Sequence, residues 1–302
     1  MIRSRSAALF SVLLPALASP AAGAAEPFAY GVGVAPLSVF ELRIWDLADG
    51  SYSVIAPLDF AVAAPHLAFG PDGTLYALDM FEGRLFTVDP RTGETTAIGP
   101  QNPHPGEIQL HGFAADACGR LWATGLVFDE GPAAESWLFA VDPETGDLEE
   151  VATGDAFVFL ALAGEGERLW GLGAEGLVRV DLRDFSVQGI GGAPPGIPRG
   201  LGFAADGTLW ATSYIPPPPI TIPPHFGQFS FTVDPATGEV GDVAENVPIP
   251  LGAFAIGPPA GSCLGGSPLE VPALGPAGLA ALALFLALGA LLRIRGHAST
   301  AC

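Results

Sequence analysis

Two recurring elements, a strand-turn-strand hairpin and a shorter strand pair that precedes it, run through residues 28–257 without a long helical pattern between them. They predict an all-β fold, a five-bladed β-propeller. The hairpin is clearest at residues 84–98, where Leu85 to Val88 favour a strand and Asp89-Pro90-Arg91-Thr92-Gly93 favours a tight turn. In such a turn proline fixes φ, the aspartate carboxylate accepts hydrogen bonds from turn N–H groups, and glycine adopts a left-handed backbone.

The hairpin recurs at intervals that suit one propeller blade. Its turn aspartates are Asp46, Asp89, Asp142, Asp181 and Asp234, spaced 43, 53, 39 and 53 residues apart. The preceding strand pair, Phe69 to Ala77, returns at Phe203 to Ala211, with looser copies at 113–123 and 160–171. A four-stranded unit that repeats roughly every 40–50 residues is typical of the blades of a propeller. We therefore expect the aspartates to stabilise turns rather than to bind metal.

The two ends of the repeat region predict how the ring closes. Phe28 to Gly33 matches the second strand of a blade, and Ala253 to Gly257 matches the first. We expect these segments to pair in one composite blade, which removes two exposed sheet edges. One aromatic position recurs in every blade and is expected to pack between neighbouring blades; it is occupied by Tyr30, Tyr76, Trp122, Trp170 and Trp210.

The composition argues against nucleic acid as a partner. The chain has 12 basic residues, all arginine, against 32 acidic residues, and its net charge is −20. Such a charge repels phosphate backbones. The three cysteines, Cys118, Cys263 and Cys302, show no metal-binding spacing. A disulfide between Cys118 and Cys263 is compatible with an oxidising compartment, and the sequence leaves it open.

The two ends of the chain predict export and membrane attachment. Residues 1–25 have the charged start, short apolar core and small residues of a secretory signal peptide. The apolar core is too short to favour the alternative, an N-terminal membrane anchor. After the propeller, predicted over 26–257, we expect a Pro/Gly linker with a sorting-like motif at 258–276. A transmembrane helix with a basic end is predicted at 277–295 and a tail at 296–302.

Two resemblances extend this description. The phrases Gly-Pro-Asp-Gly-Thr-Leu-Tyr-Ala, at 70–77, and Val-Asp-Pro-x-Thr-Gly resemble those of bacterial propellers of the NHL-repeat and streptogramin-lyase type. Those lyases rely on a catalytic histidine that has no counterpart on a matching motif in this chain, so we assign no catalytic residue.

The tail is similar to the IPTL-CTERM and PEP-CTERM sorting signals of Gram-negative bacteria. Its motif and basic end are Val271, Pro272, Ala273, Leu274, Arg293 and Arg295. This resemblance implies a Gram-negative source. It also implies a protein that is anchored in the membrane, or that lies at the cell surface or outside the cell after sorting.

The order of strands within a blade predicts which face binds a ligand. Connections between second and third strands, and those between blades, lie on one face and contain the long, dissimilar segments; we call it the long-loop face. The remaining connections are short and lie on the opposite, tight-turn face. Near the channel mouth on the long-loop face, the candidate ligand-binding residues are His66, His111, Arg199, Glu107 and Tyr214.

Together these features predict an exported, envelope-associated propeller that binds a protein or carbohydrate ligand through its long-loop face without catalysis. The alternative is a propeller hydrolase or lyase that acts at the channel mouth, with or without a divalent cation. The sequence identifies no cofactor and no metal ligands, and it lacks the phosphate-loop and metalloprotease motifs. Histidines clustered with carboxylates at the inner strands would favour the enzyme, whereas glycine, alanine and leucine there favour the binding protein.

Overall fold

The structure of the protein is a computed structural model. It describes residues 28–35, 39–58, 65–80, 82–99, 108–127, 135–154, 157, 159–215, 227–246, 254–259 and 261. The predicted signal peptide, sorting motif and transmembrane helix lie outside these residues. Within the described ranges, no helix is long and apolar enough to cross a membrane.

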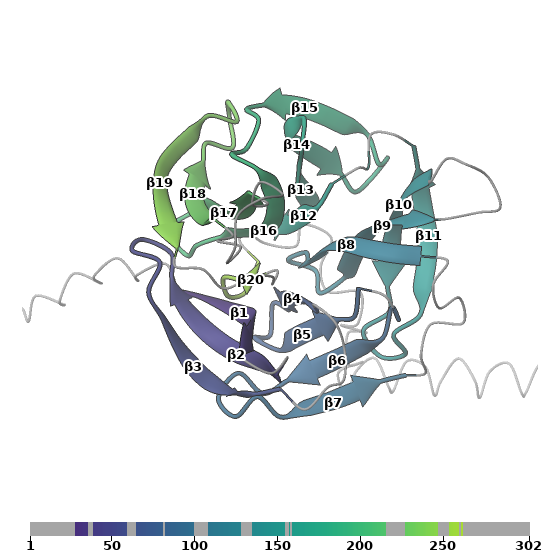
Figure 1. Cartoon of the computed structure of the whole chain (residues 1–302). Helices are drawn as coiled ribbons and strands as arrows, with labels where there is room; N and C mark the ends of the chain where they lie inside the picture. The colour runs from purple at the N-terminus through teal and green to yellow at the C-terminus, as the bar shows by residue number, and fades with distance from the viewer. Residues whose placement is uncertain are drawn as a thin grey trace, which may run out of the picture.

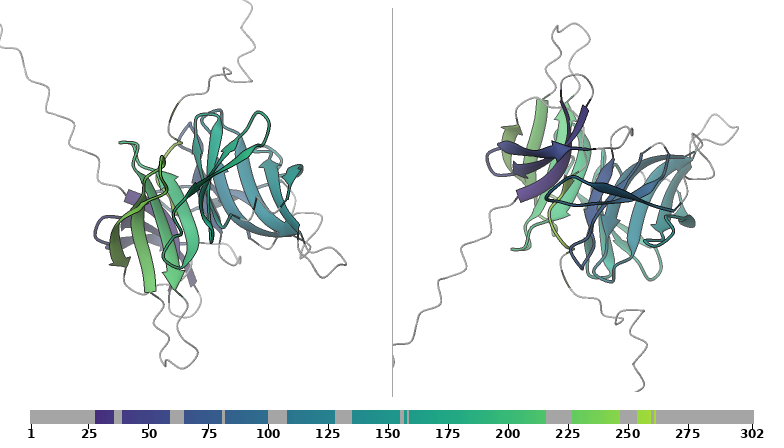
Figure 2. Two further views of the ribbon diagram at one scale, coloured as in Figure 1. Left: turned by 90° about the horizontal axis from the view of Figure 1, so that it is seen from above. Right: turned by 90° about the horizontal axis from the view of Figure 1, so that it is seen from below.

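Five four-stranded antiparallel sheets surround a central channel like the blades of a propeller (Figure 1). This arrangement confirms the predicted all-β, five-bladed fold. Seen edge-on, the strands of each blade run between the two faces of the ring (Figure 2). Each blade places one strand against the channel and three strands successively farther out. The blades follow one another in the order of the sequence, because each repeat is one antiparallel unit with short internal connections.

The four strands of each blade succeed one another from the channel outwards. Blade 1 contains β20 (Phe254–Ala255), β1 (Phe28–Ala35), β2 (Val39–Asp46) and β3 (Tyr52–Pro57). Blade 2 contains β4 (His66–Phe69), β5 (Leu75–Leu78), β6 (Leu85–Val88) and β7 (Thr95–Ile98). Blade 3 contains β8 (Ile108–Ala115), β9 (Leu121–Val127), β10 (Glu135–Val141) and β11 (Leu148–Thr153). Blade 4 contains β12 (Ala161–Glu165), β13 (Arg168–Gly173), β14 (Gly176–Asp181) and β15 (Val187–Gly191). Blade 5 contains β16 (Ile197–Phe203), β17 (Leu209–Ile215), β18 (Gly227–Val233) and β19 (Val240–Asn246).

Blade 1 is built from both ends of the repeat region, as the sequence predicts. The C-terminal strand β20 pairs with the N-terminal strand β1, with Tyr30 opposite Ala255 and Gly31 opposite Phe254. The pairing covers two residues of each strand, fewer than the predicted segments contain. It nevertheless supplies the innermost strand of the blade. The ring therefore has no unpaired inner edge at the junction of its ends.

The turn aspartates act as the sequence predicts. The Oδ1 atoms of Asp89 and Asp142 each accept a hydrogen bond from the backbone N–H two residues later, at 2.7 Å in both turns. The same contact occurs at Asp46, Asp181 and Asp234. Four of the five turns end on a glycine with positive φ, for example Gly93 at 71°. In the turn after β14 this position is Phe185, with φ of 57°, so a bulky residue there adopts a conformation that favours glycine.

The hydrophobic core lies between neighbouring blades rather than within one blade. Tyr30 of blade 1 packs edge-on against Phe69 of blade 2, with ring centroids 5.4 Å apart. Trp170 of blade 4 packs in the same way against Phe203 of blade 5, at 6.1 Å. Trp122 and Trp170 are buried, whereas the other three members of the recurring aromatic position are half-buried. These contacts confirm that the aromatic residues pack between blades.

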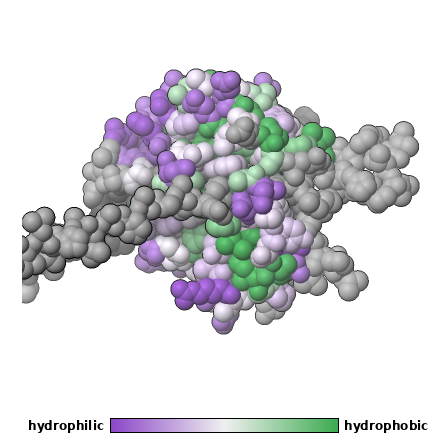
Figure 3. Space-filling model, turned by 90° about the vertical axis from the view of Figure 1, so that its left-hand side faces the viewer, coloured by the Kyte–Doolittle hydropathy of each residue, from purple (hydrophilic) through white to green (hydrophobic). Residues whose placement is uncertain are grey.

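The outer side of the ring is largely polar. In Figure 3, where blades 1 and 5 face the viewer, hydrophilic surface separates patches of hydrophobic residues. Some large exposed hydrophobic residues lie on the outermost strands, among them Val54 on β3 and Val243 on β19. Isolated apolar residues of this kind are normal on soluble proteins.

Cys118 forms a disulfide, and its partner lies outside the described residues. The N–H of the neighbouring Ala117 donates to the carbonyl of Gly166, at 3.1 Å. Gly261 lies beside the same residue, since a Cβ on Gly261 would be 2.9 Å from the Gly166 nitrogen. The C-terminal segment therefore passes close to Cys118 two residues before Cys263.

Candidate functional site

Three of the predicted ligand-binding residues lie on inner strands at the long-loop end of the channel. His66 is the first residue of β4, His111 lies in β8, and Arg199 lies in β16. The sequence predicts them just before their strands, but the strands of blades 3 and 5 begin earlier than expected. We call His66, His111 and Arg199 the mouth cluster.

Two members of the mouth cluster occupy irregularities in their strands. The pairing of β8 with β9 shifts between Leu110 and Gly112, so His111 has no partner across the sheet. The pairing of β16 with β17 shifts in the same way around Arg199. An extra residue of this kind changes the direction of its side chain.

Gly112, which follows the first of these shifts, has no room for a side chain. A Cβ there would lie 2.7 Å from Thr124 Oγ1 and 2.9 Å from Leu162 Cγ, in the next blade. Adjacent blades therefore meet closely where the bulge turns His111 out of the strand pairing.

Burial determines the charge of the two histidines. His66 is 4% exposed. Its burial, and to a lesser extent the nearby His111 and Arg199, lower the pKa of His66 to about 3. His111 is half-buried, and its burial and the Arg199 charge lower its pKa as well. Both imidazoles are therefore neutral at pH 7, and the guanidinium of Arg199 supplies the positive charge of the cluster.

Arg199 is held by an aromatic ring. Its guanidinium carbon lies 4.5 Å from the centroid of the Tyr214 ring, a cation–π contact. The structure thus brings together four of the five predicted ligand-binding residues. The fifth, Glu107, lies outside the described residues.

Several nitrogen atoms of the mouth cluster are buried and hydrogen-bond to none of the described residues. Nε2 of His66, Nε2 of His111 and Nε of Arg199 have no hydrogen-bond partner among the described residues. Buried polar groups are nearly always hydrogen-bonded, so three such atoms in one place require an explanation. A guanidinium and neutral imidazoles can all donate, and the group that suits them is therefore an acceptor.

The sequence analysis missed two polar residues close to the cluster. Asp79 is fully buried at the end of β5, and its Oδ1 accepts a hydrogen bond from the N–H of Glu82 at 2.7 Å. Asp79 directly follows β5, which pairs with β4, and this position in the sequence could have indicated that it lies near His66. Thr212 lies opposite Gly200 in the sheet, and its buried Oγ1 has no partner among the described residues. The equivalent Thr124 of blade 3 donates to the carbonyl of Phe159 at 2.9 Å, so the recurring threonine could have been noticed.

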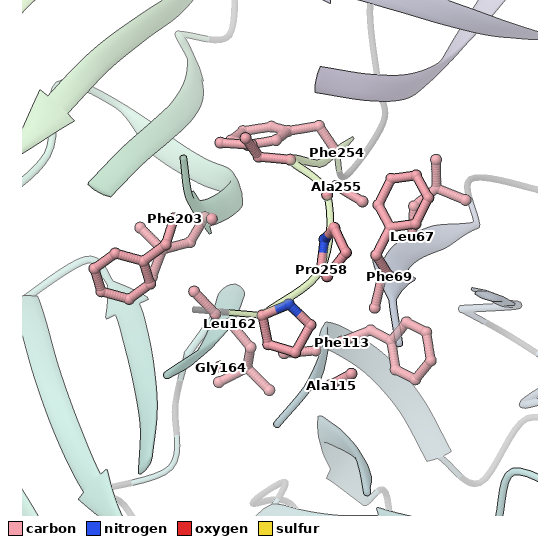
Figure 4. Close-up of a pocket in the computed structure, with 18 residues that line it drawn as sticks. Leu67, Phe69, Phe113, Ala115, Leu162, Gly164, Phe203, Phe254, Ala255 and Pro258 are labelled. Atoms are coloured by element: carbon pink, nitrogen blue, oxygen red, sulfur yellow. The ribbon is translucent and has the colours of Figure 1, made fainter. Parts of the chain in front are cut away.

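The opposite end of the channel is filled by the chain itself. Residues 254–259 cross the channel beside the inner strands, and Pro258 lies between Phe69, Phe113 and Leu162 (Figure 4). The cavity left there is about 40 Å³ and is lined by apolar side chains and backbone. A site for a small organic ligand usually has several hundred Å³ (roughly 300–1,000), so this end holds at most a few waters. Alanine, leucine, glycine, phenylalanine and proline are prominent in this lining.

A second hollow, of about 260 Å³, lies on the tight-turn face beside blade 4. Three of its charged groups have partners: Arg183 pairs with Glu167 at 3.1 Å, and Glu165 accepts a hydrogen bond from Trp170 Nε1 at 3.0 Å. In the part of the chain that the structure describes, no three His, Cys, Asp or Glu side chains are placed to hold a metal ion.

No protein-family model matches the sequence, and no curated protein matches it in a sequence comparison. Several solved propeller structures are similar in fold. One, from a nidogen/laminin complex, has 12% identity and a TM-score of 0.48, and the match covers 76% of this chain and 80% of that one. A gluconolactonase from Xanthomonas campestris has 14% identity and a TM-score of 0.45, with coverage of 78% and 80%. Virginiamycin B lyase from Staphylococcus aureus has 14% identity and a TM-score of 0.37, with coverage of 76% and 74%. These similarities do not indicate the function of this chain, which has to be argued from the site itself.

Proposed function

We propose that this β-propeller is an exported, envelope-associated protein that binds a protein or carbohydrate ligand through its long-loop face and catalyses no reaction. The observation that carries the proposal is the contrast between the two ends of the channel. At the long-loop end, buried nitrogen atoms lack partners among the described residues, and at the tight-turn end the chain fills the channel with Pro258 and its neighbours. Polar groups that can bind a ligand thus lie at the long-loop end, whereas apolar residues of the chain block the tight-turn end.

The path of the C-terminal segment supports a defined orientation. The innermost strand β20 leads into Gly257 beside the tight-turn ends of the other inner strands, and Gly261 lies against the turn between β12 and β13. The chain therefore leaves the ring on the tight-turn face. A membrane helix at 277–295 would then hold the long-loop face away from the bilayer, where it can meet soluble or surface-bound partners.

Export and anchoring can be tested by fractionation. We expect the full-length chain in the membrane fraction after export, and a chain that ends before Val271 in the soluble exported fraction. Full-length, unprocessed protein in the cytoplasmic fraction would contradict both terminal assignments. Loss of Arg293 and Arg295 should affect processing or topology if the tail acts as a sorting signal.

The binding face can be tested with two matched surface changes. Ile215, at the long-loop end of β17, and Val243, on the outer strand β19, are 46% and 51% exposed. We expect carbohydrate or peptide arrays to show binding by the unaltered chain that Ile215→Arg removes and Val243→Arg preserves. Equal loss with both changes, or binding that neither change affects, would place the binding elsewhere.

The alternative, a hydrolase or lyase at the channel mouth, rests on the neighbouring histidines His66 and His111. It predicts turnover of ester, lactone or glycoside substrates that disappears in His111→Gln. Binding without turnover is the result that our proposal requires. Catalysis that depends on His111 would overturn it.

A further inference from the structure

The buried nitrogens at the channel mouth, which have no partner among the residues that the structure describes, indicate the chemistry of a ligand. We propose that the mouth cluster binds the carboxylate group of a small ligand, which the Arg199 guanidinium and N–H groups of His66 and His111 hold together. This inference rests on the proposed binding function of the long-loop face, and it adds a chemical class of ligand.

The geometry of the inner strands brings the donors together. The three residues come from blades 2, 3 and 5, and Arg199 is close enough to both histidines for its charge to affect them. His66 is nine-tenths buried or more, so its Nε2 has lost water without gaining a partner among the described residues. An unpaired buried donor is costly, and an acceptor bound at the mouth would remove that cost for several donors at once.

Charge selects a carboxylate over other acceptors. The cluster contains one fixed positive charge, since both histidines are neutral near pH 7. One carboxylate balances one guanidinium, whereas a phosphate would bring a second negative charge that the other two members of the cluster do not offset. The net charge of −20 also repels long polyanions.

The shape of Arg199 fits the same ligand. The Tyr214 ring lies over the guanidinium at 4.5 Å. A cation–π contact uses the face of the aromatic ring and none of the hydrogen-bond donors of the guanidinium. Two parallel N–H groups on one edge match the two oxygens of a carboxylate.

The test uses the full-length chain in uncharged detergent micelles, with ¹⁵N-labelled histidine side chains observed by NMR. The probes are sodium glucuronate, N-acetylglycine, inorganic phosphate and glucose at pH 7. His66→Gln and His111→Gln identify the two side-chain signals. Arg199→Gln removes the charge and Arg199→Lys keeps it without the planar fork. Arg183→Gln is the control, because Arg183 is exposed on the tight-turn face.

We expect glucuronate, N-acetylglycine or both to shift the His66 and His111 signals in a saturable way. Response to glucuronate alone would identify a sugar acid, and response to N-acetylglycine alone a peptide carboxyl end. Arg199→Gln should weaken binding at least tenfold, Arg199→Lys should weaken it less, and Arg183→Gln should leave it unchanged. Thermal melting establishes that each variant is folded.

Three results would overturn the inference: no shift with either carboxylate, a stronger response to phosphate, or equal affinity in folded Arg199→Gln. Suppose that neither carboxylate shifts the histidine signals, but the arrays show binding that Ile215→Arg removes. That result would refute the carboxylate site and leave the proposed function unaffected. Carboxylate binding without any array binding would support the carboxylate site and refute the proposed binding of a protein or carbohydrate.

Discussion

The buried His66 predicts that the protein loses stability in mild acid. The pKa of this imidazole is about 3 in the folded protein against an ordinary value of 6.5, which we take for the unfolded chain. Between these values the unfolded chain binds a proton that the folded protein excludes. Stability contributed by the neutral, buried side chain is therefore complete above pH 6.5 and falls as the pH falls towards 3.

The size of the effect follows from the two pKa values. One pKa unit corresponds to about 1.4 kcal/mol, so the full separation is worth roughly 5 kcal/mol. Between about pH 7.5 and pH 5, where most carboxylates stay ionised, the free energy of unfolding should fall by about 2 kcal/mol. For a propeller of this size, such a loss lowers the melting temperature by roughly 4–8 °C.

The assay compares the unaltered chain with His66→Gln, a neutral and polar replacement. Urea unfolding at a series of pH values from about 5 to 7.5 gives the free energy of unfolding for each protein. We expect the unaltered chain to lose about 2 kcal/mol more than the variant across this range. His111 and the carboxylates are present in both proteins, so their contributions cancel. Parallel pH profiles would refute the reasoning, because they would mean that His66 is protonated equally in both states.

Three further predictions concern the closure of the ring and its turns. Gly200→Ala should destabilise the protein by several kcal/mol, because the new Cβ would overlap the Phe254 ring, whereas Gly189→Ala, in open space, should be nearly neutral in urea unfolding. Asp116→Ala should cost about 1–3 kcal/mol in the same measurement, since it leaves the buried Trp122 Nε1 and the N–H groups of its turn without their acceptor; an unchanged free energy of unfolding would contradict this. Reducing the Cys118 disulfide should cost about 2–4 kcal/mol, and peptide mapping of the unreduced chain should join this cysteine to Cys263 rather than to Cys302.

The blades, their number and the pairing that closes the ring could be predicted from the sequence. The reason is that each hairpin depends on contacts between residues close in the chain. Asp89 accepts the N–H of Arg91, and Gly93 adopts its left-handed conformation within the same turn. Turn chemistry and strand alternation of this kind can be read from one stretch at a time, and repetition then gives the number of blades.

The surroundings of the residues at the two ends of the channel could be learned only from the folded structure. His66 and Arg199 are distant in sequence, and they approach because the ring closes between blades 1 and 5. Their neutral or charged state follows from burial, which a linear pattern does not reveal. The bulges that direct His111 and Arg199 arise where neighbouring blades pack tightly, as the contact between Gly112 and Leu162 shows. The composition around Pro258 predicts a linker. In the structure Pro258 fills the channel instead, because the inner strands leave apolar space there that a proline can occupy.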